Sequence, residues 1–197
     1  MSRRQMSPIG PELLDAAAEA VARWGVGGLT LERVAAEAGM SRATIYRRGV
    51  TREDLVEALT VEAADTYTKA MLPALARPGT AYERLRYALE ALCDTADQHL
   101  HVLAGLFLAQ GEVFHRPGPD ALVVDVFAEP FERLLTDGAA DGTLRDLPPT
   151  VTATVLFNIV GWGYIHLRAA HHWQPQGARD SILDLVLRGV GLDPEEG

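Results

Sequence analysis

The sequence has little cysteine: Cys93 is the only one among 197 residues, so no disulfide can form within the chain. This is typical of a reducing compartment, and Cys93 is expected to be a core thiol, with redox sensing as the alternative. Long hydrophobic runs are also missing. The most apolar runs, 102–109 and 153–167, are shorter than the roughly 18 residues of a membrane span. Without an apolar signal region, we expect a cytoplasmic protein with no membrane segment.

Catalytic signatures are absent as well. The sequence shows no nucleophile paired with a base, no glycine-rich phosphate loop and no metal-ligand spacing. His171 and His172 are adjacent, so they point to different faces of a helix, and no cysteine or carboxylate cluster accompanies them. We therefore expect solvated histidines at a helix end, no metal, no cofactor, no catalytic residue, and a protein that is not an enzyme.

Positive charge is scarce overall, and its distribution is uneven. The net charge is −9, yet residues 1–52 contain eight arginines and only five acidic residues. Residues 53–197 contain ten basic and 22 acidic residues. This asymmetry indicates a basic nucleic-acid-binding head on an acidic body.

Apolar residues make up 48% of the chain and recur at helical spacing, without the alternation that a sheet needs. We predict an all-α fold of about nine helices. It has two expected domains, a three-helix domain, 1–51, and a larger helical domain, 52–197. The predicted helices are 11–24, 31–38, 42–48, 52–72, 80–96, 99–115, 119–137, 150–172 and 179–191. Prolines and glycines mark the main breaks: the stretch from Pro73 to Gly79, then 116–119, 137–149 and 174–177.

The stretch from 29 to 48 predicts a helix-turn-helix. Thr30 and Ser41 are good N-caps for its two helices, since a side-chain oxygen can accept a backbone N–H there. Gly39 lies where the chain must turn, because glycine adopts positive φ without strain. Apolar pairs typical of the hydrophobic staple flank each of the first four predicted helix starts: Ile9 with Leu14, Leu29 with Val34, Met40 with Ile45, and Val50 with Leu55.

The second of these helices carries the chemistry that DNA recognition needs. Its arginines can donate two hydrogen bonds to guanine or neutralise phosphates, although arginines that merely solvate a helix are the alternative. With Ile45 facing the core, Ala43 and Arg47 face away from it. The residues predicted near base edges are Arg42, Ala43, Thr44 and Arg47, with Ala43 as a possible contact for a thymine methyl group.

Residues 9–55 resemble the DNA-binding domain of the tetracycline-repressor (TetR) family of bacterial regulators. The matching residues are Ile9, Ala16, Ala17, Gly25, Leu29, Thr30, Val34, Ala35, Ala38, Gly39, Met40, Ser41, Thr44, Ile45, Tyr46, Arg47, Arg52, Glu53 and Leu55. The sequence departs from the family where Gly49 replaces the usual phenylalanine and Arg52 the usual lysine. Val50 is expected to fill part of the space of the missing aromatic ring.

The resemblance implies a homodimer that binds a near-palindromic operator. The third helix of each subunit would lie in one of two successive major grooves. It also implies phosphate contacts from Thr30, Tyr46, Arg48 and Arg52. The complete set of predicted DNA-binding residues is Thr30, Ser41, Arg42, Ala43, Thr44, Tyr46, Arg47, Arg48, Thr51 and Arg52.

For the body, the resemblance implies a ligand cavity, and the last two helices are the expected dimer surface. The candidate ligand-binding residues are Tyr67, Tyr87, Phe107, Gln110, Phe127, Phe131, Asn158 and Trp162, although an aromatic residue is more often a core residue than part of a pocket. The candidate interface residues are Val155, Ile159, His166, Ile182, Leu185, Val186 and Gly189.

Together these observations favour a repressor that a small hydrophobic effector of unknown identity releases from double-stranded operator DNA. The alternative is a helix-turn-helix regulator without a small-molecule effector, either protein-responsive or architectural. No membrane partner is expected.

Overall fold

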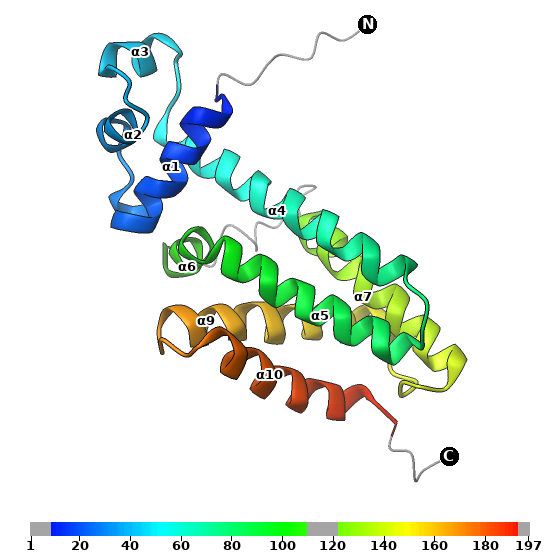
Figure 1. Cartoon of the computed structure of the whole chain (residues 1–197). Helices are drawn as coiled ribbons and strands as arrows, with labels where there is room; N and C mark the ends of the chain where they lie inside the picture. Colours follow the sequence, from blue (N-terminus) through cyan, green and yellow to red (C-terminus); the bar gives the residue numbers. More distant parts are fainter. Residues whose placement is uncertain (1–8, 110–121, 193–197) are drawn as a thin grey trace, which may run out of the picture. The chain divides into compact units, whose positions relative to one another are not determined.

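A computed structural model describes residues 9–109 and 122–192 (Figure 1). Its helices and helical turns, in chain order, are α1 Pro11–Trp24, a 3₁₀ turn Val26–Gly28, α2 Leu31–Glu37, α3 Arg42–Arg47, α4 Arg52–Ala76, α5 Ala81–Gln98, α6 Leu100–Ala109, α7 Leu122–Asp141, α8 Pro149–Phe157, a π-helical turn Asn158–Trp162, α9 Gly163–Ala169 and α10 Pro175–Val190. Counted with α8, the π turn and α9 as one helix, the described residues form nine helices. The predicted all-α fold is confirmed.

The described residues divide into two compact units. The first contains 9–64 together with His101–Ala109, and the second contains Asp65–Leu100 together with 122–192. This division falls inside α4, past the predicted domain boundary at 51–52. The first unit has a continuous apolar core to which α1 to α4 and α6 contribute; its members include Leu13, Val21, Val34, Ile45, Leu55 and Leu106.

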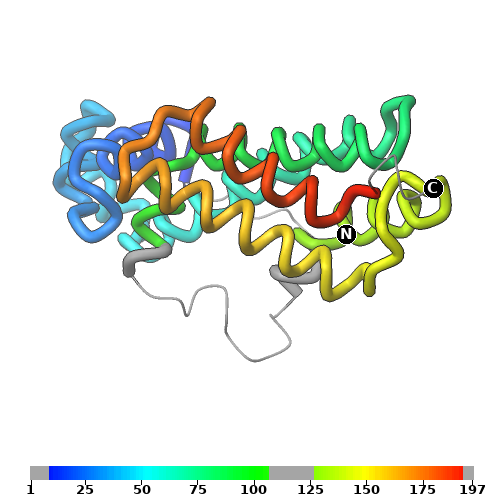
Figure 2. The backbone as a smooth tube through the Cα atoms, turned by 90° about the horizontal axis from the view of Figure 1, so that it is seen from below, coloured from blue at the N-terminus to red at the C-terminus, as the bar shows by residue number. Residues whose placement is uncertain are grey.

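In the second unit, α5 is the central helix. It packs against α7, the π turn, α9 and α10, and Figure 2 shows α10 (orange to red) beside the run from α8 to α9 (yellow to orange). Its start is specified locally by a capping box: Glu83 N–H donates to Thr80 Oγ1 (3.2 Å), and Thr80 N–H donates to Glu83 Oε2 (2.9 Å). The apolar residues of α5 recur at helical spacing and are buried, so this helix organises the core of the second unit.

Several predicted boundaries are wrong by a few residues. The sequence predicts that the fourth helix ends near Leu72, but α4 continues through Pro73 to Ala76, and Arg77 N–H donates to the Pro73 carbonyl (3.0 Å). A proline removes one hydrogen bond, yet its own φ is helical, so it does not by itself end a helix. The last helix starts at Pro175 rather than 179, because proline suits the first helical position.

Two other boundaries also differ. The helix α7 continues to Asp141, beyond the predicted 137. The run from α8 ends at Ala169, before the predicted 172, because His172 adopts a positive φ of 56°. The second half of the predicted helix 99–115 and the break at 116–119 lie outside the described residues.

Candidate nucleic-acid interface

The candidate recognition helix, α3, is held in place by its cap and by one buried side chain. Ser41 Oγ accepts the Thr44 N–H (3.2 Å), as Thr30 Oγ1 accepts the Arg33 N–H at the start of α2 (3.3 Å), so both predicted N-caps are confirmed. Gly39 has a φ of +61° in the intervening turn, as predicted. Ile45 is completely buried. This orients α3 with its apolar side toward the core.

The opposite side of α3 faces solvent. The predicted DNA-contacting residues Ser41, Arg42, Ala43, Tyr46, Arg47 and Arg48 are all exposed, and Thr44 is half-buried. Tyr46 is 59% exposed although it is aromatic. Two arginines and an exposed phenol on α3, with Arg48 at its C-cap, form a cationic surface with hydrogen-bond donors, which suits phosphates and base edges.

Glu32 on α2 orients this tyrosine. The Tyr46 hydroxyl donates to Glu32 Oε1 at 3.4 Å. A hydrogen bond from its own backbone N–H and the charge of Arg42 lower the pKa of Glu32, so this carboxylate stays ionised and accepts the bond. Sequence reasoning did not find this contact, because the two residues are 14 positions apart.

Arg52 has a structural role that the sequence did not reveal. Its Nε donates to the Leu29 carbonyl (3.1 Å) and its Nη2 to the Val26 carbonyl (2.8 Å), while Nη1 lies 3.6 Å from Glu53. The first residue of α4 is thereby tied to the turn that precedes α2. Its predicted phosphate contact stays a prediction.

Gly49 and Val50 form the junction between α3 and α4. Gly49 has a φ of +69°, where any other side chain is strained. Val50 is only 3% exposed and packs in the core, as expected for a residue that fills the space. Thr51 N–H donates to Asp54 Oδ2 (2.8 Å) and Asp54 N–H to Thr51 Oγ1 (3.1 Å), and the bonds from Thr51 lower the pKa of Asp54. This reciprocal pair starts α4.

In the second unit, part of the predicted ligand set forms an aromatic cluster. The rings of Tyr67 and Phe127 meet edge-on at 5.2 Å, and Phe157 stacks on Phe127 at 5.6 Å. The Tyr67 hydroxyl donates to the Phe127 carbonyl (2.5 Å), and burial raises its pKa. Phe157 is a member that sequence reasoning missed, since nothing in its neighbourhood distinguishes it from a core residue.

The remaining ligand candidates are dispersed. Phe131 is completely buried as a core residue. Asn158 donates to the Thr154 carbonyl at 2.7 Å, within its own helix, and Trp162 is half-buried. Gln110 and the side chain of Phe107 lie outside the described residues.

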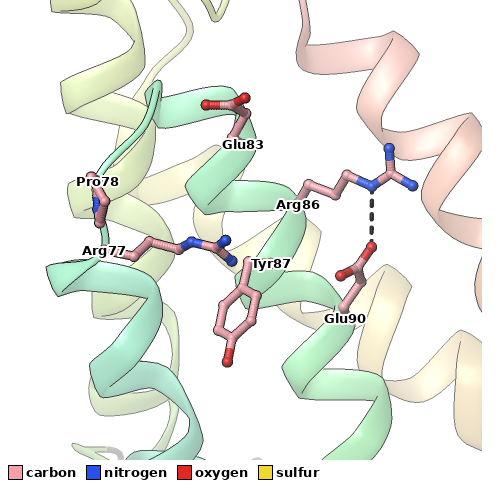
Figure 3. Close-up of a pocket in the computed structure, with 6 residues that line it drawn as sticks. All are labelled: Arg77, Pro78, Glu83, Arg86, Tyr87 and Glu90. Atoms are coloured by element: carbon pink, nitrogen blue, oxygen red, sulfur yellow. Dashed lines mark hydrogen bonds and ion pairs between the residues drawn. The ribbon is translucent and has the colours of Figure 1, made fainter.

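Tyr87 lines a different, polar pocket of about 350 Å³ at the turn between α4 and α5 (Figure 3). The other lining residues are Arg77, Pro78, Glu83, Arg86 and Glu90. The Arg77 guanidinium lies 4.3 Å from the centre of the Tyr87 ring, and Arg86 Nε donates to Glu90 Oε1 (3.1 Å). The charged groups are thus engaged with their neighbours in the pocket wall.

The predicted dimer residues lie on α8 to α10 with different exposures. Val155, Ile159, His166, Leu185 and Gly189 are exposed, Ile182 is half-buried, and Val186 is buried within the chain. Among the described residues, the run Pro149–Ala169 is long and apolar enough to cross a membrane by length and composition, and a third of its apolar window is buried. In this fold it packs along α7 and α5. Its other face is an exposed apolar surface.

Cys93 is completely buried in α5. Burial raises the pKa of its thiol to about 12, which disfavours the reactive thiolate. The expectation of a core thiol is confirmed.

A capped helix-turn-helix with an exposed basic face, joined to a helical body, defines the class of helix-turn-helix DNA-binding regulators. Residues 13–59 match the profile described as "Bacterial regulatory proteins, tetR family". This segment therefore matches the DNA-binding domain of the TetR family of bacterial regulators. No curated protein sequence matches it significantly.

Solved structures of TetR-family regulators share the fold over most of the chain. A TetR/AcrR-family regulator from Thermobifida fusca is 22% identical (TM-score 0.68, covering 90% of this chain and 96% of that chain). The regulator PfmR from Thermus thermophilus is 20% identical (TM-score 0.70, 92% and 98%). FadR from Bacillus subtilis, solved in complex with stearoyl-CoA, is 18% identical (TM-score 0.67, 90% and 97%).

We expect Arg52→Lys to destabilise the first unit by about 1–3 kcal/mol, because lysine keeps the charge but cannot donate from a planar fork to both carbonyls. Urea unfolding measures the free energy. The exposed Arg47→Lys is the matched control and should change it by less than about 0.5 kcal/mol. Equal stability of the two variants would show that Arg52 does not brace the turn.

Proposed function

We propose that the protein is a homodimeric transcriptional repressor in the cytoplasm. It binds a near-palindromic operator through α3, and a small hydrophobic effector bound to the second unit releases it. The observation that carries the DNA-binding part is the position of Ile45 in the core, with the arginines of α3 turned to solvent.

The exposed residues of α3 divide between two tasks. Arg42, Ala43, Thr44 and Arg47 read base edges, with guanine and the thymine methyl group as the matching partners. Tyr46 and Arg48 contact phosphates, together with Thr30, Ser41, Thr51 and Arg52 at the starts of α2, α3 and α4, where helix N-termini favour anions. The acidic body repels DNA and so confines the contact to the first unit.

The test begins with DNA selected from a random pool by the purified protein. On the selected operator, Arg47→Ala should weaken binding by about 1–3 kcal/mol and relax the preference at one base pair. Arg48→Ala should weaken binding to all sequences. It should also lower the slope of the logarithm of the binding constant against the logarithm of the salt concentration by about one. Fluorescence anisotropy at several salt concentrations measures both effects.

Arg86→Ala, in the second unit, is the matched control for the loss of one arginine. If Arg47→Ala and Arg48→Ala bind all selected sequences like Arg86→Ala, α3 does not read DNA.

Exposed apolar residues on the last helices support the dimer. Val151, Val155 and Ile159 are 64%, 46% and 52% exposed at intervals of four residues, and Leu185 on α10 is 73% exposed. A contiguous apolar face of this kind marks an interaction site. A second copy that packs the same helices against it forms a four-helix bundle and gives the twofold symmetry that a palindromic operator requires.

We expect Ile159→Arg combined with Leu185→Arg to yield a monomer, since four arginines per dimer would be desolvated at the interface. Light scattering after gel filtration measures the mass. Operator affinity should fall at least about 100-fold, because each head then binds one half-site alone. Val61→Arg introduces the same charge at an exposed valine of the first unit and should leave the dimer intact. A dimeric double variant would place the interface elsewhere.

The effector part of the proposal rests on the aromatic cluster of Tyr67, Phe127 and Phe157. Phe127 and Phe157 are half-buried, so the cluster presents apolar rings that are not completely covered. The likeness to FadR, which was solved with stearoyl-CoA, supports an apolar molecule as ligand. To act, the effector must bind with different affinity to the DNA-bound and DNA-free arrangements of the dimer.

The test titrates fatty acids, acyl-CoA thioesters and steroids into the protein–operator complex. We expect one of these classes of compound to release the DNA. Phe157→Ala should raise the concentration needed for half release by about fivefold, since an aromatic contact contributes about 1 kcal/mol. Its DNA affinity without effector should not change. Tyr87→Ala is the control outside the cluster. Failure of every apolar compound would favour the regulator without a small-molecule effector.

A further inference from the structure

We propose that His166 and His171 form a binding site for a divalent transition-metal ion of the zinc, nickel and copper group. Their Nε2 atoms lie 3.2 Å apart, and the ring centres are 4.9 Å apart with planes at 80°. Both residues are exposed in the single chain.

The separation of the two nitrogens matches that of two ligands on one ion. With metal–nitrogen bonds of about 2.0–2.1 Å at a tetrahedral angle, two bound nitrogens lie about 3.3 Å apart. An N–H···N hydrogen bond between the rings uses one lone pair, whereas a metal ion uses the lone pairs of both neutral imidazoles. Imidazole nitrogen is a preferred ligand of zinc, nickel and copper.

The end of α9 brings the two rings together. Residues five apart on a regular helix do not share a face. Here the chain turns back after Ala170: His171 N–H donates to the His166 carbonyl (3.3 Å), Trp173 N–H donates to the Leu167 carbonyl (3.1 Å), and His172 takes a φ of 56°. A residue other than glycine in this left-handed conformation is unusual and occurs often at functional sites.

Contacts to α5 hold this turn independently of any ion. Arg168 Nε donates to Asp97 Oδ1 (2.7 Å), and its Nη1 donates to the carbonyl of Trp173. The Tyr164 hydroxyl donates to the other oxygen of Asp97 (2.5 Å). The rings therefore project from a backbone that is already fixed, which lowers the entropic cost of placing both ligands on one ion.

Two protein ligands define the expected chemistry. In the part of the chain that the structure describes, no group of three or more histidine, cysteine or carboxylate side chains forms, so the proposed site has two histidine ligands. Such a site selects ions that prefer nitrogen and discriminates against Mg²⁺, which prefers oxygen. The pair differs from the adjacent His171 and His172, which were not expected to bind a metal, because its members come from α9 and from the turn after it.

The experiment titrates metal-free protein, purified without a polyhistidine tag, with ZnCl₂ or NiCl₂ in a calorimeter. We expect one ion per chain, a rise in Tm with ZnCl₂, and no heat with MgCl₂. His166→Ala and His171→Ala should each weaken binding at least about tenfold, whereas His172→Ala should change it less than about twofold.

Nitrogen-15 NMR of the histidine rings in the wild-type chain gives a second readout that does not depend on variants. The Nε2 resonances of His166 and His171 should shift together on addition of ZnCl₂. The proposal is overturned if the wild-type chain binds neither ion. It is equally overturned if the alanine variants of His166 and His171 bind like the wild type, or if His172→Ala loses binding to the same extent.

Discussion

The candidate DNA-binding surface depends on one constraint: α3 has only six residues. Isolated helices shorter than about 12 residues are marginal in water, so α3 exists because its surroundings hold it. The buried side chain of Ile45 and the Ser41 cap supply that support. Because these contacts lie on the inner side of the helix, the outer side is left to basic residues that contribute little to folding.

In the second unit, too, the contacts that hold the helices together and the exposed surface lie on opposite sides. The helices α9 and α10 present charged groups to α5: Arg168 pairs with Asp97, and Arg179 pairs with Asp94. Paired charges are weak contributors to stability but favour one arrangement of the packed helices. The opposite side of the α8 helix run carries Val151, Val155 and Ile159, which remain exposed in the single chain. An arrangement fixed by polar contacts thus leaves an apolar face for another molecule.

The first unit could be predicted closely from the sequence, since α1 agrees with its predicted range at both ends and both caps are formed. In the body, the helix boundaries shifted at Pro73 and Pro175. Proline is compatible with a helix start and with a helix interior that lacks one hydrogen bond, and the choice depends on what packs against the segment. The candidate sites there were found only in part: Phe157 was missed beside Tyr67, and the ring pair at the end of α9 was missed because a spacing of five residues is not a helical face.

The sequence by itself determined the helical class, the caps, the turn at Gly39 and the basic character of α3. Each of these depends on backbone chemistry within a few residues, which a linear pattern records. Only the tertiary structure decided that Arg52 braces a turn 23 to 26 residues away, that Tyr67 donates to a carbonyl 60 residues away, and which apolar face stays uncovered. Those contacts require distant segments to pack together, and packing depends on the shape of the whole core rather than on local spacing.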